Sequence, residues 1–336
     1  MSSDYVRRIL RARVYDVAQK TPLQDAPQLS AQLNNRVMLK REDMQPVYSF
    51  KLRGAYNKLA NLSAEQRQHG VIAASAGNHA QGLALAALAM VCPATIVMPL
   101  TTPAIKIAGV RARGATVVLY GETFADALAY ALNQCEQNGL TFIHPYDDPD
   151  IIAGQGTVAL EILEQLAEPD AIFIPVGGGG LIAGIAAYMK YMRPQTKIIG
   201  VEPEDSNCLQ QALQAGARVT LAQVGNFADG VAVSEIGEHT FELCRTRVDQ
   251  VITVSSDEIC AAIKAVFEDT RAILEPSGAL AVAGIKRYVE ETGCSGKSLV
   301  AVSSGANINF DRLRYVAERA ELGQEREALC AVTLAG

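Results

Sequence analysis

Short apolar runs alternate with helical patterns along almost the whole chain. Between these runs, apolar residues recur every three or four positions, as do Leu52, Tyr56 and Leu59, which places them on one helix face. This alternation is typical of parallel sheets whose faces are covered by helices, and it predicts an α/β protein. Runs rich in β-branched residues predict strands at 37–40, 71–74, 95–98, 116–119, 171–175, 197–202, 250–254 and 298–302.

The composition is that of an ordinary folded protein. The chain has 336 residues, 49% hydrophobic and 20% charged, which suits about two domains of roughly 150 residues and excludes a disordered chain. Its net charge of -6 gives no general attraction for nucleic acid, so the expected partner is a small molecule. The seven cysteines form no CxxC pair, which indicates a reducing, cytoplasmic compartment.

One uncharged stretch, residues 80–105, has the length of a membrane span. Pro93, Pro99 and Pro103 would disrupt a spanning helix, so we interpret the stretch as a buried helix followed by a buried strand and expect no membrane association. The basic N-terminus would suit a transit peptide or a basic arm. Acidic residues interrupt its charge, which favours an amphipathic surface helix.

Four consecutive glycines connect the predicted strand 171–175 to an apolar helix. Glycines allow backbone N–H groups to converge at a helix N-terminus, where an anion is favoured, whereas a tight turn needs only one or two of them. The glycine loop, defined as Gly177, Gly178, Gly179, Gly180 and Leu181, is therefore predicted to bind phosphate. Its spacing does not match GxxxxGK[ST] and meets only a relaxed GxGxxG, which disfavours ATP and leaves NAD as an alternative.

Lys51 lies at the start of a predicted helix, for which Ser49 is the expected N-cap. A cation at a helix N-terminus opposes the helix dipole, so this position helps to lower the pKa of the lysine amine. Taken alone, a lysine at a helix start is usually solvated. Combined with a phosphate site, an activated lysine points to a Schiff base with pyridoxal phosphate.

Two further polar loops follow predicted strands. The SAGNH loop, Ser75-Ala76-Gly77-Asn78-His79, offers backbone donors, a hydroxyl, an amide and an imidazole, which together suit a carboxylate. The alternatives are that Ser75 is an ordinary N-cap and that His79 is a core histidine. The loop 303–307 follows the last predicted strand, and ligands of open α/β sheets bind beyond the carboxyl ends of strands.

These loops together resemble those of the fold type II pyridoxal-phosphate enzymes, and among them the biosynthetic threonine deaminase (threonine dehydratase) family. The resemblance extends from residue 5 to about residue 318 and implies a two-lobed architecture of parallel-rich twisted sheets flanked by helices. It is carried, in chain order, by the motifs SFKLRGA, SAGNHAQG, GGGGL, EPSGA and SSGAN.

The resemblance also implies a domain organisation. Residues 1–52 and 146–318 would form a large cofactor-binding domain, and residues 53–145 a small inserted α/β domain. Residues 319–336 would be the stub of a C-terminal regulatory domain. For a chain that ended there, we expect activity without inhibition by isoleucine; a shorter, catabolic-type enzyme is the rival interpretation. A homo-oligomer, dimer or tetramer, is implied by the family only.

The resemblance assigns roles to individual residues. Lys51 would form the Schiff base beside Phe50 and remove the Cα proton of the substrate. Asn78 would contact the ring oxygen of the cofactor, and Ser304 the pyridine nitrogen. The glycine loop would bind the phosphate and the SAGNH loop the substrate carboxylate. Glu275 would lie near the ring without an assigned role.

The implied reaction is the dehydration and deamination of L-threonine to 2-oxobutanoate and ammonia, the first step of isoleucine biosynthesis, with L-serine as a slower substrate. A neutral serine hydroxyl at the pyridine nitrogen cannot keep that nitrogen protonated, which favours elimination over transamination. Alternatives are β-replacement of the cysteine-synthase type and a nucleotide-binding or regulatory protein with a degenerate site.

Three positions depart from the patterns of relatives. Ala76 stands where serine racemases carry a second serine, which weakens the racemase alternative. Cys208 stands where some metal-binding relatives have the last acid of a set that includes Glu202, so we expect no divalent-metal requirement. Ala306 replaces a glycine that many relatives have in the last loop.

Overall fold

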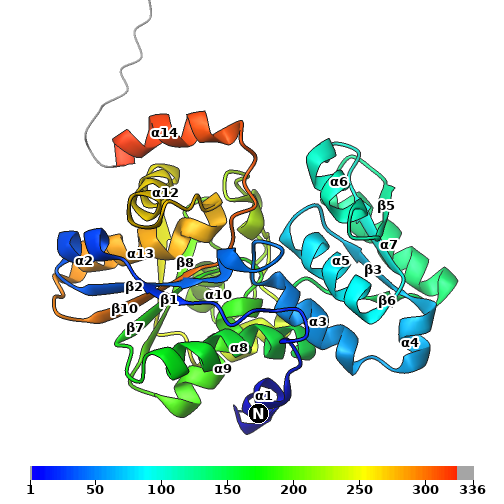
Figure 1. Ribbon diagram of the computed structural model, residues 1–336, viewed down its shortest axis with the longest axis horizontal. Coiled ribbons are helices and arrows are strands. Elements are labelled where there is room, and N and C mark those ends of the chain that lie inside the picture. Colours follow the sequence, from blue (N-terminus) through cyan, green and yellow to red (C-terminus); the bar gives the residue numbers. More distant parts are fainter. Residues whose placement is uncertain (1, 324–336) are drawn as a thin grey trace, which may run out of the picture.

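The computed structural model describes residues 2–323 and contains two separate sheets flanked by helices (Figure 1). The larger sheet has six strands in the order β1-β2-β10-β7-β8-β9, and only the β1–β2 pairing is antiparallel. The predicted α/β class with parallel-rich sheets is thus confirmed. The strands are β1 (Leu23–Asp25), β2 (Arg36–Arg41), β7 (Ala171–Pro175), β8 (Lys197–Pro203), β9 (Gln250–Val254) and β10 (Ser298–Ser303).

The smaller sheet has four parallel strands in the order β5-β4-β3-β6. All of them come from residues 71–142, inside the segment 53–145 that was predicted as a small domain. The eight predicted strands are all present across the two sheets, whereas β1 and β6 were not predicted. The strands of the smaller sheet are β3 (Val71–Ala74), β4 (Ala94–Met98), β5 (Thr116–Leu119) and β6 (Thr141–Phe142).

Apolar side chains on both faces of the sheets explain why the strands are continuous hydrophobic runs. In β7, Phe173 belongs to a buried core cluster with residues of α12 and α13, while Ile172 and Ile174 belong to a second cluster with residues of α8 and α9. In the smaller sheet, β3 divides its residues in the same way between α5 and α7. Strands buried on both faces need apolar residues at every position, which removes the alternating pattern of a half-exposed strand.

Helices surround both sheets, and α3 (Lys51–Asn61) lies between them, packed against both α5 and α8 (Figure 1). Beside the smaller sheet are α4 (Ala64–His69), α5 (Asn78–Met90), α6 (Ala104–Arg111) and α7 (Phe124–Asn138). Around the larger sheet are α1 (Ser2–Arg11), α2 (Pro27–Leu33), η1 (Glu42–Met44), α8 (Pro149–Gln165), α9 (Gly180–Met192), α10 (Cys208–Ala215), η2 (Asp229–Val231), α11 (Glu238–Cys244), α12 (Ser256–Thr270), α13 (Pro276–Thr292) and α14 (Arg312–Gly323).

The segments that resembled a membrane span and a transit peptide are parts of the fold. Residues 80–105 form most of α5, then β4 and the start of α6. Helix α1 buries Val6 and Ile9, as an amphipathic surface helix does. Within residues 2–323, no helix is both long and apolar enough to cross a membrane. Most of the predicted regulatory stub, residues 324–336, lies outside the described part of the chain.

Candidate active site

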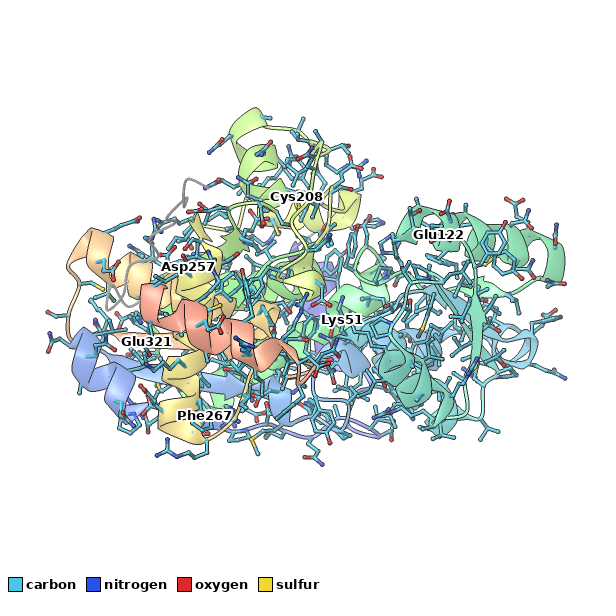
Figure 2. The ribbon with its side chains drawn as sticks, turned by 90° about the horizontal axis from the view of Figure 1, so that it is seen from above. Lys51, Glu122, Cys208, Asp257, Phe267 and Glu321 are labelled. Atoms are coloured by element: carbon cyan, nitrogen blue, oxygen red, sulfur yellow. The ribbon has the colours of Figure 1, made fainter. Side chains whose placement is uncertain are left out.

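A cavity of about 770 Å³ lies where the loops of the two sheets meet. Seen from above, Lys51 lies between the smaller sheet, marked by Glu122, and the helices of the larger sheet, marked by Phe267 (Figure 2). Every residue that the sequence predicted for the site lines this one cavity: Phe50, Lys51, Ser75, Ala76, Gly77, Asn78, His79, Gly177, Gly178, Gly179, Gly180, Leu181, Glu275 and Ser304.

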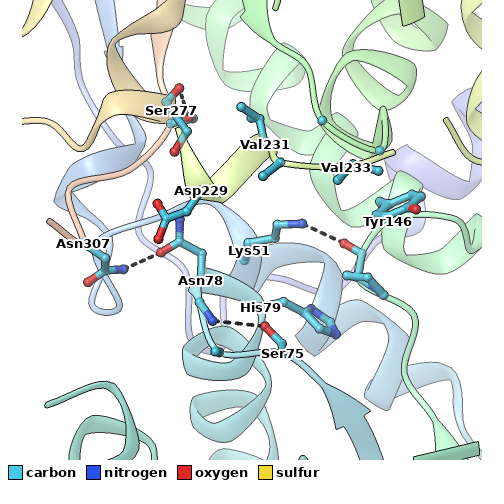
Figure 3. A pocket seen from close by; sticks show the side chains of 18 of the residues that line it. Lys51, Ser75, Asn78, His79, Tyr146, Asp229, Val231, Val233, Ser277 and Asn307 are labelled. Carbon is cyan, nitrogen blue, oxygen red and sulfur yellow. Dashed lines mark hydrogen bonds between the residues drawn. The ribbon is translucent and has the colours of Figure 1, made fainter. Parts of the chain in front are cut away.

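Lys51 is the first residue of α3, and its amine points into the cavity toward the turn that carries Tyr146 (Figure 3). Its Nζ donates to the carbonyl oxygen of Pro145 at 2.8 Å and lies 5.4 Å from the ring centroid of Phe50. Burial lowers the pKa of Lys51 to about 8, although the Glu275 carboxylate acts in the opposite direction. A larger share of the amine is therefore neutral, and nucleophilic, near pH 7 than for a solvated lysine.

The prediction that Ser49 caps α3 is wrong. The N-cap residue is Phe50, whose backbone is already helical, and the Ser49 hydroxyl is buried without a hydrogen-bond partner in the described residues. The backbone of Ser49 pairs with Gly305 in an isolated β-bridge, and the N–H of Phe50 donates to Ser304 O at 3.3 Å. This contact with the loop after β10 fixes the entry to α3 in place of a side-chain cap.

The glycine loop connects β7 to α9, and each glycine is tightly packed. Gly179 has φ +92°, and a Cβ on Gly178 would lie 2.2 Å from the ring of Tyr146. The N–H groups of Gly177 to Leu181 donate to no acceptor in residues 2–323. Because these free donors lie at the N-terminus of a helix and line the cavity, they form a site for an anion such as phosphate.

The SAGNH loop connects β3 to α5 and also has free donors. The Ser75 hydroxyl oxygen accepts from the N–H groups of Gly77 (3.2 Å) and Ala80 (3.3 Å), so its proton is free to donate (Figure 3). Within the described chain, the N–H groups of Ala76, Asn78 and His79 have no acceptor. The N-cap of α5 is Gly77 and not Ser75. These donors suit a carboxylate.

The side chain of His79 has a structural contact. Its Nε2 bonds the carbonyl oxygen of Ile143 at 2.9 Å, which requires the proton to be on Nε2. Burial lowers the pKa of His79 to about 3, and the positive charge of Lys51 contributes. The imidazole is therefore neutral. The interpretation of His79 as a satisfied core histidine holds for its side chain, whereas its backbone N–H is one of the free donors of the SAGNH loop.

A second polar group lines the wall formed by α13 and the loop after β10. Asn307 Nδ2 donates to Asn78 Oδ1 at 2.7 Å (Figure 3). Asn78 Nδ2 in turn donates to Glu275 Oε1 at 2.6 Å. Burial raises the pKa of Glu275 to about 7, partly offset by the bond from Asn78. The Ser304 hydroxyl makes only a long bond, 3.5 Å, to Ser277 O, and the buried Ser277 hydroxyl has no partner in residues 2–323.

The sequence did not identify several residues that line the cavity. Among them are His144, Pro145 and Tyr146, which follow the two-residue strand β6, and Asp229 in η2, whose carboxylate is 3.0 Å from Lys106 Nζ of α6. The HPYD segment after a short apolar run was the only available signal, and it has no periodic pattern.

Glu202 and Cys208 do not line the cavity. The Glu202 carboxylate is buried and accepts the N–H groups of Leu209 and Gln210, each at 2.9 Å, and Cys208 Sγ is 3.5 Å from Gly177 O. Among residues 2–323, no group of three or more His, Cys, Asp or Glu side chains is arranged to hold a metal ion.

The residues present fit pyridoxal phosphate. This cofactor has a phosphate, an aldehyde, and a ring with polar edges. The cavity supplies five free N–H groups from Gly177 to Leu181, an amine of lowered pKa in Lys51, and two hydroxyls, Ser277 and Ser304, that lack good partners. Each polar part of the cofactor therefore has a matching group on the wall of one cavity.

Comparisons with known proteins agree with this assignment. The chain is 60% identical over 337 residues to a biosynthetic L-threonine dehydratase of Burkholderia multivorans, and 54% identical over 332 residues to that of Escherichia coli. Each match spans 99% of this chain, but only 66% and 65% of the respective relative. The chain thus covers slightly less than two thirds of the length of these relatives.

Solved structures are similar over nearly the whole chain. The processed form of threonine deaminase isoform 2 from Solanum lycopersicum has a TM-score of 0.94 and 52% identity, covering 95% of this chain and 93% of that one. Maize serine racemase has a TM-score of 0.87 and 32% identity, covering 96% and 98%. The family described as pyridoxal-phosphate dependent enzyme matches residues 14–305, so the chain belongs to the family of pyridoxal-phosphate dependent enzymes.

Proposed function

We propose that this protein is an L-threonine ammonia-lyase, which removes water from L-threonine and, once water has hydrolysed the resulting enamine, yields 2-oxobutanoate and ammonia, with L-serine as a secondary substrate. One observation carries the proposal: the Lys51 amine, the glycine loop and the SAGNH loop line the same cavity. The relatives named threonine dehydratase and threonine deaminase support the choice of substrate. The reaction would be the first step of isoleucine biosynthesis.

The residues that would hold the cofactor follow from the free groups of the cavity. The glycine loop would bind the phosphate, Lys51 would hold the aldehyde carbon covalently, and Ser304 would lie at the ring nitrogen. Asn78 and Phe50 would lie beside the ring, with Glu275 holding the Asn78 amide. Bound pyridoxal phosphate withdraws electrons from the bonds at Cα of an amino acid joined to it.

The protein itself supplies a base and a carboxylate site. Once an incoming amino group frees its amine, Lys51 accepts the Cα proton at Nζ, and its lowered pKa keeps the neutral form accessible at physiological pH. The Pro145 carbonyl, 2.8 Å from Nζ, orients the amine. The SAGNH loop holds the substrate carboxylate through its free N–H groups and the Ser75 hydroxyl.

Racemisation is a second candidate, because maize serine racemase has nearly the same fold. Racemisation needs an acid on the face of Cα opposite to the lysine. Ala76 lines the cavity at the position where, by the resemblance, serine racemases carry a second serine that acts as this acid. The methyl group of alanine cannot transfer a proton. This residue favours elimination.

A product assay tests the proposal. The purified chain is incubated with L-threonine, with and without added pyridoxal phosphate, and 2-oxobutanoate and ammonia are measured beside a Lys51→Ala control. Borohydride reduction and peptide mapping are expected to place a pyridoxyl group on Lys51. Sulfide-dependent turnover of O-acetyl-L-serine without threonine deamination would instead indicate β-replacement, and a colourless, unmodified protein would indicate a binding protein.

We also propose a homo-oligomeric assembly, a cytoplasmic location, and a division of the chain into a small domain at 53–145 and a large domain formed by 1–52 and 146–318. The separate four-stranded sheet within residues 71–142 supports the division. Light scattering after size-exclusion chromatography measures the oligomeric state, and limited proteolysis tests the boundaries.

A further inference from the structure

We propose that His144 donates a hydrogen bond from Nε2 to the β-hydroxyl oxygen of the substrate and so distinguishes hydroxy amino acids from other amino acids. This inference rests on the proposed function and extends it to the leaving group. It starts from a donor that lines the cavity and that neither the cofactor nor the substrate carboxylate requires.

The hydrogen bonds of His144 determine where its proton lies. Its Nδ1 is 3.1 Å from the backbone N of Tyr146 and 2.8 Å from that of Asp147, and both N–H groups point at it. A nitrogen that accepts from N–H groups carries no proton, so a neutral ring is protonated at Nε2. The hydrogen bonds of the His144 ring within residues 2–323 both use Nδ1 and none uses Nε2, while the residue lines the cavity.

The imidazole is also held in place. Its ring meets the ring of Tyr146 edge-on, with centroids 4.6 Å apart, and that of Phe142 with centroids 6.2 Å apart. The next residue, Pro145, accepts the hydrogen bond from Lys51 Nζ. One short turn after β6 therefore fixes both the catalytic amine and the imidazole, so their relative positions are set by the same backbone.

The charges around His144 keep the ring neutral. Burial lowers its pKa, the positive charge of Lys51 acts in the same direction, as does His239, and the carboxylates of Asp147 and Asp148 act against them. The neighbouring His79 offers no comparable donor, because its Nε2–H already bonds Ile143 O. His144 is therefore the histidine of this cavity whose N–H is free for a ligand.

The choice of the hydroxyl follows from matching donors to acceptors. The glycine loop has enough free N–H groups for a phosphate, and the SAGNH loop has enough for a carboxylate. The substrate amino group is joined to the cofactor, so the remaining substrate atom with lone pairs is the β-oxygen. A neutral imidazole N–H transfers no proton here; it stabilises the negative charge that develops on this oxygen as the Cβ–O bond breaks. The oxygen leaves as water, and the proton that it takes up balances the one that Lys51 accepts from Cα.

Three variants and three substrates test the inference. His144→Phe removes the donor, His144→Gln retains an N–H, and His69→Asn is a matched control at an exposed histidine on α4. Initial rates are measured with L-threonine, L-serine and β-chloro-L-alanine, whose chloride leaves without a strong hydrogen bond. Cofactor binding is followed by absorbance, because a role in cofactor binding would appear there.

For His144→Phe we expect kcat/KM to fall about 10- to 100-fold for threonine and serine and to stay within about threefold for chloroalanine. His144→Gln should recover part of the loss, and cofactor absorbance should not change. An equal loss of kcat/KM with all three substrates, or unchanged threonine turnover, would overturn the proposed role of His144 and leave the proposed function standing. A wild-type protein that eliminates chloride from chloroalanine but is inactive with both hydroxy amino acids would overturn the proposed function instead.

Discussion

A buried ion network beneath Lys51 gives the sharpest prediction for stability. Arg53, the third residue of α3, pairs with Glu42 at 2.7 Å and with Glu161 at 2.9 Å, and Lys40 pairs with Glu161 at 2.6 Å. All four side chains have 0% exposure. The network joins α3 to η1, β2 and α8 and balances two cations against two anions, so its net charge is zero.

Replacing Arg53 by methionine would leave two buried carboxylates facing one lysine. Removing one partner from a buried pair costs about 3–5 kcal/mol, because the remaining charge has neither water nor a counter-ion. Arg53→Lys keeps the charge but loses the forked contact with both carboxylates, so its cost should be smaller. Urea unfolding followed by far-UV circular dichroism, at one saturating cofactor concentration, measures these differences.

The pH dependence of the cost tests its electrostatic origin. In the wild type, burial raises the pKa of Glu42, but Arg53 above all, together with Thr21 and Lys40, more than offsets it, so the folded-state pKa lies below the usual value. That stabilisation is present above the unfolded-state pKa and is lost as pH falls through the folded-state value. Without Arg53, burial would dominate and Glu42 would bind a proton on folding, so the cost of Arg53→Met should shrink between pH 7 and pH 5.

An exposed ion pair serves as the matched control. Arg36 and Asp25 are 2.9 Å apart with exposures of 56% and 61%, so Arg36→Met should cost no more than about 1 kcal/mol. A cost below about 1 kcal/mol for Arg53→Met, or a cost that does not change with pH, would refute the electrostatic explanation.

Three further predictions concern the cavity. The rate at which Lys51 in the cofactor-free protein combines with pyridoxal phosphate should rise with pH and reach a plateau above about pH 8, because only the neutral amine reacts. A rate that still rose tenfold per pH unit beyond pH 9.5 would contradict this. Gly179→Ala, at φ +92°, should cost about 1–2 kcal/mol and weaken cofactor binding, whereas Gly139→Ala, at φ +63° in open space, should cost stability only. Lys106→Met, which breaks the pair with Asp229 between α6 and η2, should raise KM less than about fivefold without lowering kcat, and high salt should have the same effect; a kcat loss would contradict this.

The sequence predicted the interior strands well because burial on both faces requires apolar residues at every position. The missed strands, β1 (Leu23–Asp25) and β6 (Thr141–Phe142), are short and lie at sheet edges. An edge strand has a partner on one side only, and two or three residues do not form a recognisable run. Their pairing is visible only once the neighbouring strand is in place.

The site shows the same limit. The glycine loop, the SAGNH loop and the loop 303–307 were recognisable because each follows a predicted strand, and parallel strands bring their carboxyl ends to one edge of a sheet. The expected cap at Ser49 failed because its backbone pairs with Gly305, more than 250 residues away in the chain. The bond between Asn78 and Glu275 likewise joins residues that are 197 positions apart, and no local pattern indicates it.

The cavity offers an anion backbone dipoles more than charged side chains. Of the described residues that line it, Lys51 and Lys106 are balanced by Asp229 and Glu275, and no arginine is among them. The free N–H groups lie instead at the N-termini of α9 and α5, where helix dipoles add positive potential. Such backbone donors would hold a phosphate and a carboxylate without placing a competing cation beside Lys51, so the amine could lose its proton and act as the proposed base.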